Sequence, residues 1–365
     1  MPKQEFALLE LFDKFIIESK NGKRLQKNGK RINPRTVEQY EYLKGLLAKF
    51  EESKQFPLRI RLLQKPTKRV FEVEKNYWKR FYHKFLDFLY QDLDCYDNYV
   101  GSAVKMLRVF FNYLSETKGM PIGTSYKQFY VPKEDISIVV LSPEQLNYLI
   151  YDKAFEQGLS ADMQVVKDIF VFGCTVALRF SDLIQLQIPN LEFINERWYL
   201  KVTSQKTQTF TRVLLPEYAR DIVLKYNKKH KTLLPAFSKN YLNQKVKQLI
   251  ELAGWVHPVA KTRNKRGIPV IVYKEKHKLH RFCDMVTTHT MRRTAITTML
   301  SLGMPEFMVR KISGHAPNSR EFFRYVALAQ SYMDTELTIV YDKLTNKTLQ
   351  TSLELKTISD HLMAG

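Results

Sequence analysis

Four residues near the end of the sequence combine side chains that can bind an anion and attack it. His289 and Arg292 lie three residues apart in the run T-H-T-M-R-R-T, His315 follows Gly314, and Tyr325 comes ten residues later. Guanidinium and imidazole groups donate hydrogen bonds to anionic oxygens, and a phenol is a potential nucleophile. The set therefore predicts an anion-binding site with a nucleophile beside it.

Two consecutive helical patterns position these residues. His289 and Arg292 lie at the start of the first pattern, so both project from one face of its first turn. Gly303 ends this helix, and Pro305 begins the next one, which Gly314 ends. The apolar positions are Ala295, Ile296, Met299 and Leu300 in the first helix and Phe307, Val309 and Ile312 in the second.

A strong excess of basic residues indicates a polyanionic partner. The 365 residues include 58 Lys and Arg against 37 Asp and Glu, giving a formal net charge of +21 and a sequence pI of about 9.6. Both halves of the chain carry this excess, which suits a protein that grips a polyanion from two sides. The alternative is a basic surface that serves only solubility. The length is enough for two or three domains.

The cysteines and the hydropathy pattern predict a cytoplasmic protein with no membrane segment. Cys95, Cys174 and Cys283 are odd in number, far apart and without C-x-x-C spacing, which argues against a disulfide framework and a zinc site. No run of 18 or more apolar residues occurs, and the first 15 residues are amphipathic, unlike a signal peptide.

The first 118 residues predict a helical domain rich in aromatic residues. Apolar stripes at helical spacing predict helices over 5–18, from 34 to about 50, over 75–89 and over 97–118, and the basic segment 20–35 is a hinge or a nucleic-acid contact. Aromatic residues in the third helix alternate with lysines, and at this spacing they form a core more often than they contact nucleic acid. The candidate phosphate contacts are therefore Lys75, Lys79 and Lys84.

A change of pattern separates this domain from a second one. Glycines and prolines between 119 and 132 prevent a regular helix, and Ser142-Pro143 then provides the N-cap and the first residue of a new helix. We therefore predict an N-terminal helix and basic segment over 1–33, a helical domain with its linker over 34–132, and a second domain with a C-terminal tail over 133–365. The predicted fold is mainly α with a small antiparallel β-sheet.

Two further cationic residues stand out in the second domain. Arg179 follows the apolar helix predicted over 162–178, and a guanidinium near a core needs an anion, either a bound phosphate or Asp182 three residues later. A three-stranded antiparallel meander over 191–215 places Lys206 at a hairpin tip. By itself, a lysine at a tip is usually just solvated.

A one-sided basic insert precedes the first histidine. Residues 254–281 contain eight basic residues and one acidic residue, Glu275, around a hairpin predicted at 268–273. Such a run is either a solvated loop or a phosphate contact, and its proximity to the candidate site favours contact. Within it, the candidate contacts are Lys261, Arg263, Lys265 and Arg266.

Taken in order, Arg179, Lys206, His289-x-x-Arg292, Gly314-His315 and Tyr325 resemble the catalytic boxes of the tyrosine recombinases, the phage and transposon integrase family. The resemblance implies a helical core-binding domain followed by an α+β catalytic domain. The pattern departs from the family at Arg293, where many members have a second His, and Asp182 stands where Glu is most common. Tyr332 is a second possible nucleophile.

The resemblance also implies an activity. Tyr325 would form a 3′-phosphotyrosyl bond with double-stranded DNA at a specific site, Arg179 and Arg292 would bind the phosphate, and Lys206 would protonate the leaving 5′ oxygen. His289 would move the tyrosine proton and His315 would donate to a non-bridging oxygen, with no metal and no cofactor. A catalytically silent DNA-binding regulator and a type IB topoisomerase that lets strands swivel are the alternatives.

The end of the chain predicts an assembly. Apolar residues after Tyr325 recur at helical spacing: Leu337, Ile339, Val340, Leu344, Leu349 and Leu353. Such a stripe either covers its own domain or enters a neighbouring copy. Related recombinases pass a C-terminal helix to the next protomer, so the resemblance implies a homotetramer on DNA, with accessory DNA-bending proteins as further possible partners.

Overall fold

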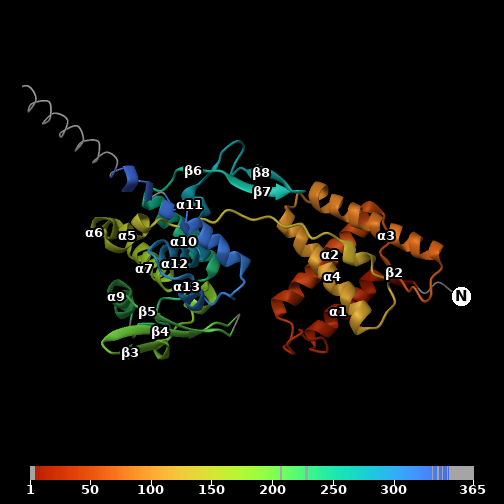
Figure 1. The fold of residues 1–365 in the computed structure, drawn as a ribbon, viewed down its shortest axis with the longest axis horizontal. Coiled ribbons are helices and arrows are strands. Elements are labelled where there is room, and N and C mark those ends of the chain that lie inside the picture. Colours follow the sequence, from red (N-terminus) through yellow and green to blue (C-terminus); the bar gives the residue numbers. More distant parts are fainter. Residues whose placement is uncertain are drawn as a thin grey trace, which may run out of the picture. The chain divides into compact units, whose positions relative to one another are not determined.

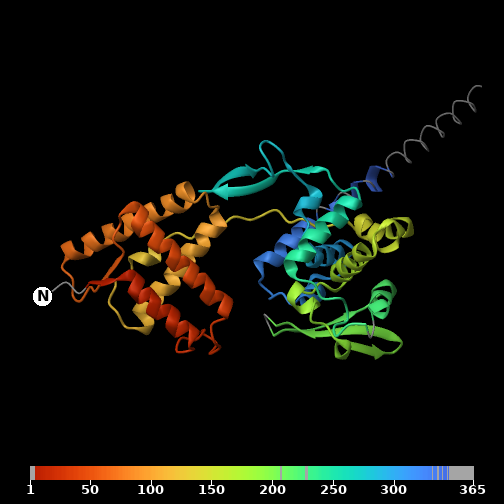
Figure 2. The same ribbon diagram turned by 180° about the vertical axis from the view of Figure 1, so that it is seen from behind.

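The computed structural model describes residues 5–205, 208–226, 229–330, 332–334, 337–338, 340–342 and 344. They form two compact units (Figures 1 and 2). Unit 1 contains the described residues up to Ser137 together with Ala260–Tyr273, and unit 2 contains Ile138–Val259 and the described residues from Lys274 onward. The predicted fold class, mainly α with small antiparallel sheets, is confirmed. None of the described helices has the length and hydropathy of a membrane span.

Unit 1 is a bundle of four helices with two short antiparallel pairs of strands. The helices are α1 (Leu8–Lys20), α2 (Pro34–Lys54), α3 (Lys68–Asp87) and α4 (Asp97–Asn112), with π-helical turns at Phe88–Asp92 and Tyr113–Thr117 and a 3₁₀ turn at Ser125–Gln128. Strand β1 (Glu5–Ala7) pairs with β2 (Arg59–Arg61), and β7 (Lys261–Lys265) pairs with β8 (Ile268–Val272).

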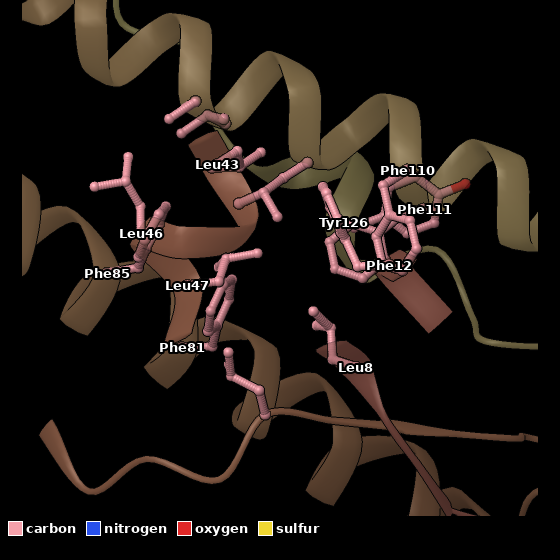
Figure 3. Packing of buried hydrophobic residues seen from close by; sticks show 14 of the residues in the cluster. Leu8, Phe12, Leu43, Leu46, Leu47, Phe81, Phe85, Phe110, Phe111 and Tyr126 are labelled. Atoms are coloured by element: carbon pink, nitrogen blue, oxygen red, sulfur yellow. The ribbon is translucent and has the colours of Figure 1, made fainter. Parts of the chain in front are cut away.

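The aromatic residues of unit 1 form its core. Figure 3 shows side chains from all four helices meeting in one cluster, including Phe12, Leu43, Phe81 and Phe110. The rings of Phe81 and Phe85 stack with their centroids 5.5 Å apart. The core interpretation of these aromatics is therefore confirmed. Lys75, Lys79 and Lys84 are exposed on α3.

The N-terminal segment belongs to this core as well. The predicted helix over 5–18 is wrong for its first three residues, because Glu5–Ala7 extend to pair with β2 in the register Glu5↔Arg61. The remainder forms α1, and its Phe15 ring lies 4.7 Å from the Tyr40 ring of α2, between ring centroids. Residues of α1 thus share one hydrophobic core with α2, and the predicted boundary at residue 34 stays a prediction.

The hairpin of the basic insert, formed by β7 and β8, belongs to unit 1. Arg266 and Gly267 form its two-residue turn with φ of 53° and 79°, the left-handed conformation that such turns need. Both of their backbone N–H groups donate to the Asp97 carboxylate at the start of α4, at 2.8 and 2.9 Å. The insert therefore adds a strand pair to unit 1 from a distant part of the sequence.

Basic side chains of the hairpin have acidic partners in unit 1. Arg263 donates to Glu134, a carboxylate that is almost fully buried, with an N–O distance of 2.6 Å. Lys265 pairs with Asp94, and the Arg266 guanidinium pairs with Asp87. The sequence-based prediction that these cations contact a polyanion stays a prediction, but three of them already have carboxylate partners.

Unit 2 surrounds the long buried helix α7 (Ala161–Val176). Its other helices are α5 (Pro143–Tyr151), α6 (Lys153–Gly158), α8 (Phe180–Leu183), α9 (Glu217–Tyr226), α10 (Lys239–Leu252), α11 (Phe282–Met285), α12 (Thr288–Ser301) and α13 (Glu306–Ser313), with a 3₁₀ turn at Ile188–Asn190 and further helical residues at 320–330. A short strand pair joins β6 (Pro258–Val259) to β9 (His280–Arg281). The start of α5 has the predicted cap, since Ser142 and Gln145 form a capping box.

The predicted meander is confirmed as a three-stranded antiparallel sheet in unit 2. Strands β3 (Leu191–Ile194), β4 (Arg197–Thr203) and β5 (Phe210–Leu214) lie in the order β3-β4-β5. Asn195 and Glu196 form the first turn with positive φ, and Thr203 pairs with Phe210 at the last register position before the second turn. In both views the sheet lies beside the helices of unit 2 (Figures 1 and 2).

A glycine allows the two central helices of unit 2 to pack closely. A Cβ on Gly173 in α7 would lie 2.5 Å from the Met291 sulfur and 3.1 Å from the Met291 Cβ on α12. Since this packing places the following residue of α12, Arg292, against the C-terminus of α7, the site described below depends on it.

We expect Gly173→Ala to destabilise unit 2 by about 1–3 kcal/mol, because the added methyl group overpacks the contact with Met291. Hydrogen exchange in increasing urea would show reduced protection of amides in α7 and α12, with unit 1 unchanged. Gly158→Ala is the matched control, since its Cβ would meet nothing within 4 Å. Equal protection in the two variants would contradict the prediction.

Candidate active site

The Arg292 side chain is buried and joins the ends of two helices. Its Nη1 donates to the carbonyl oxygen of Ala177 at 2.7 Å, and its Nη2 donates to that of Ser313 at 2.5 Å. Ala177 ends α7 in the left-handed conformation with φ of 56°, and Ser313 ends α13. The last carbonyls of a helix have no partner within the helix, so the guanidinium satisfies them. Burial, followed by the nearby Arg179 guanidinium, lowers the pKa of Arg292 to about 10.

His315 lies against Arg292 just beyond α13. Gly314 ends α13 with a positive φ of 63°, and this turn brings the imidazole within 3.4 Å of Arg292 Nη2. The Nδ1 atom lies 2.8 Å from the Ser313 hydroxyl. Burial, then the positive charge of Arg292 and other guanidiniums, lowers the pKa of His315 to about 4. The imidazole is therefore neutral at pH 7.

Tyr325 packs beside this histidine. It lies in the helical segment 320–330, is only 3% exposed, and belongs to a small apolar cluster with Ala177, Ala295 and Phe322. Its ring centroid lies 5.9 Å from that of His315. The second candidate phenol, Tyr332, is half-buried, and burial followed by the charge of Glu144 raises its pKa.

His289 lies at the start of α12, where its backbone N–H donates to the capping hydroxyl of Thr287 at 3.3 Å. The residue is exposed. Partial withdrawal of the ring from water, then the guanidiniums of Arg293 and Arg292, lower the pKa of His289 below its usual range. Both candidate histidines therefore favour the neutral imidazole, the form that can accept a proton.

Arg179 is held by a hydroxyl group rather than by a carboxylate. Its Nη1 donates to Ser204 Oγ at 3.0 Å, and Ser204 Oγ donates to Asp182 Oδ2 at 3.0 Å. The other oxygen of Asp182 accepts from the backbone N–H of Gln205 at 3.2 Å. The alternative proposed from the sequence, a pair between Arg179 and Asp182, thus exists only through Ser204 in the described residues.

The last predicted catalytic residue, Lys206, lies outside the described residues. Its neighbours Gln205 and Gln208 are described and belong to the turn between β4 and β5. The prediction for Lys206 therefore stays a prediction. The structure brings together Arg179, Arg292, His315 and Tyr325, which are separated by as many as 146 residues in the chain.

Two contributors to this site were not predicted from the sequence. One is Ser204, which holds Arg179, and the other is the pair of carbonyl groups of Ala177 and Ser313, which hold Arg292; none of them has a signature of its own. The only available signal for Ser204 was its position two residues before Lys206. No group of three or more His, Cys, Asp or Glu side chains in the described part of the chain is arranged to hold a metal ion.

The low pKa of His315 has a measurable consequence. An ordinary histidine titrates near pH 6.5, whereas His315 is expected to stay neutral down to about pH 4. Because the folded protein binds this proton less readily than the unfolded chain, the contribution of His315 to stability is complete above pH 6.5 and is lost as the pH falls towards 4. An NMR titration of ¹³C-labelled histidine, assigned with His315→Gln, would check this. A midpoint near 6.5 would contradict it.

Comparisons with known proteins give one family match and several similar folds. Residues 164–331 match the model of the phage integrase family. The fold is similar to that of XerH site-specific recombinase bound to palindromic difH substrate (12% identity, 92% of this chain and 96% of that chain, TM-score 0.54). It is also similar to that of Tn1549 transposon integrase in complex with transposon right end DNA (15%, 89% and 98%, TM-score 0.56).

A third similar structure is a lambda integrase dimer bound to a COC′ core site, with 11% identity, 88% of this chain and 95% of that chain covered, and a TM-score of 0.53. No curated protein sequence matches this chain. At these identities the structures show a shared fold. Residues 164–331 thus match the phage integrase family model, and the chain has the fold of these recombinases and integrases.

Proposed function

We propose that this protein is a site-specific DNA recombinase that cleaves and rejoins DNA through a 3′-phosphotyrosyl intermediate. One observation carries the proposal: the guanidiniums of Arg179 and Arg292 lie close enough for one to lower the pKa of the other, and neither forms a direct ion pair with a carboxylate in the described residues. A buried guanidinium and a half-buried one near it, neither with a direct counterion in the described residues, favour binding of an anion such as a phosphodiester.

The proposed reaction exchanges one phosphate ester for another. The Tyr325 oxygen attacks phosphorus and forms a P–O bond, while the bond from phosphorus to the 5′ oxygen breaks. The two guanidiniums stabilise the charge that develops on the non-bridging oxygens. The second strand's 5′ hydroxyl then attacks the phosphotyrosyl bond in reverse, so no external energy source is needed.

Proton transfers accompany both steps. His289 accepts the Tyr325 proton in this proposal, because its imidazole is neutral at pH 7 and has a nitrogen free of a proton, while its lowered pKa makes it a weaker base than an ordinary histidine. Lys206, carried over from the family resemblance, gives a proton to the leaving 5′ oxygen. His315 donates to a non-bridging oxygen, which requires a proton on the nitrogen that faces the phosphate.

The proposed partner is double-stranded DNA, which the net charge of +21 supports. The similar structures of XerH, Tn1549 integrase and lambda integrase are all bound to DNA. Lys75, Lys79 and Lys84, exposed on α3, are the proposed phosphate contacts of unit 1. The hairpin cations Lys261, Arg263, Lys265 and Arg266 stay candidates.

We also propose a homotetramer on DNA, assembled through the C-terminal tail. The described apolar residues of the tail recur at helical spacing and are exposed: Leu337 at 45%, Val340 at 48%, Tyr341 at 60% and Leu344 at 55%. Ile339, Leu349 and Leu353 lie outside the described residues. An exposed apolar stripe at this spacing fits a groove on a second copy.

Tyr325→Phe should abolish the covalent protein–DNA adduct while changing the dissociation constant for DNA by less than about twofold, because the substitution removes one hydroxyl and no charge. The measurement is trapping on a nicked suicide substrate made from DNA that flanks the gene, followed by denaturing electrophoresis. Tyr332→Phe and Tyr341→Phe are matched controls that should retain the adduct.

Other outcomes would identify the alternatives. An adduct that persists in Tyr325→Phe and disappears in Tyr332→Phe would assign the nucleophile to Tyr332. Specific binding without any adduct would indicate a regulator that does not cleave. Relaxation of supercoiled plasmid lacking the site, without strand exchange, would indicate a topoisomerase.

The α3 lysines should contribute to binding through counterion release. Replacing Lys75, Lys79 and Lys84 with Ala should reduce the slope of log binding constant against log salt by up to about 0.9 per lost contact. Replacing the four hairpin cations should reduce it less, since three of them pair with carboxylates. Alanine at Lys14, Lys49 and Lys133, also exposed in unit 1, is the charge-matched control. Equal effects in all three variants would contradict these contacts.

A further inference from the structure

Ser204 occupies a central position between the first arginine and the meander. Its side chain is 7% exposed, and its hydroxyl contacts Arg179 on one side and Asp182 on the other. A hydroxyl has one proton to donate. Because that proton goes to the carboxylate, the Ser204 oxygen is oriented to accept from the guanidinium.

The backbone of Ser204 is held firmly as well. Its N–H donates to Thr209 O at 2.9 Å, and its carbonyl oxygen accepts from Gln208 N–H at 2.8 Å, so it closes the turn between β4 and β5. The next residue, Gln205, is bound through its N–H to Asp182. The hydroxyl therefore has little freedom to leave its position between the two charged groups.

The consequence for Arg179 is electrostatic. A carboxylate in direct contact with a guanidinium forms a charge-assisted pair that would compete with a phosphate for the same N–H donors. The hydroxyl keeps the two charges one group apart, while Asp182 still orients the network. Without it, Asp182 Oδ2 and Arg179 Nη1 would each lose a partner in a partly buried place, and we expect them to pair directly.

We propose that Ser204 is a positioning residue for DNA cleavage, which holds Arg179 in place for the phosphate and prevents its direct pairing with Asp182. This inference rests on the proposed function. It predicts that Ser204, through Arg179, helps to stabilise the charge on the non-bridging oxygens. The affinity for DNA should depend mainly on the other phosphate contacts.

The test is single-turnover cleavage of the suicide substrate by Ser204→Ala and Ser204→Thr. We expect Ser204→Ala to cleave about 10- to 100-fold more slowly, the loss typical of one hydrogen bond to a charged group, with the dissociation constant changed less than about threefold. Ser204→Thr keeps the hydroxyl and should recover most of the rate. Thr203→Ala removes a neighbouring exposed hydroxyl and serves as the matched control.

Two modified substrates locate the defect. A methylphosphonate at the cleavage site replaces one charged non-bridging oxygen with a methyl group, so the difference between Ser204→Ala and the wild type should shrink to within about threefold. A 5′-bridging sulfur leaves as a thiolate that needs no proton. This substrate should not restore Ser204→Ala, because the defect does not lie in protonation of the leaving group.

Several results would overturn the inference. Cleavage by Ser204→Ala at the wild-type rate would do so. Equal defects of Ser204→Ala on normal and methylphosphonate DNA, with no recovery of the rate in Ser204→Thr, would also do so, because they would indicate a structural role. If only the bridging-sulfur substrate restored the cleavage rate of Ser204→Ala, the defect would lie in protonation of the leaving group and hence in the turn that leads to Lys206. Absence of any adduct with wild-type protein would overturn the proposed function itself, and a wild-type adduct with an unaffected Ser204→Ala would overturn this inference alone.

Discussion

The Arg292 guanidinium is the interaction on which unit 2 most depends. It bridges the carbonyl groups at the ends of α7 and α13, while its own backbone belongs to α12. Three helices thereby meet at one buried cation, and His315 takes its position from the turn that ends α13. A buried charge held only by neutral acceptors is costly for the folded protein. The close contact between Gly173 of α7 and Met291 of α12 brings these two helices together beside the guanidinium.

Local signals in the sequence were sufficient to predict most helices and the meander. Ser142-Pro143 and Asn33-Pro34 combine a capping side chain with a proline at the first helical position, and both begin helices as predicted. Alternation over 191–215 and polar turns predicted three strands. The candidate residues from Arg179 to Tyr325 all fall within residues 164–331, the region that matches the family model, and their roles stay predictions.

What the sequence could not predict depends on contacts between distant residues. The basic hairpin β7–β8 resembles a nucleic-acid contact in composition, yet its acidic partners in unit 1 lie as far as 179 residues away, at Asp87 and Glu134. A run of basic residues in the sequence looks the same whether it contacts nucleic acid or pairs with distant carboxylates of its own chain. The same holds for Ser204, which is an ordinary serine until folding places it between Arg179 and Asp182.

The two arginines share one solution to one electrostatic problem. In the proposed reaction, a cation that binds the phosphate must be held in position before the phosphate arrives, and a carboxylate would hold it by neutralising it. Here carbonyl groups hold Arg292 and a hydroxyl holds Arg179, so position is set by neutral dipoles and the charge stays available. Asp182 acts from behind the hydroxyl, where it orients Ser204 without contacting either guanidinium. Such preorganisation is useful for a transition state whose charge exceeds that of the bound substrate, because neutral acceptors can be exchanged for phosphate oxygens as that charge develops.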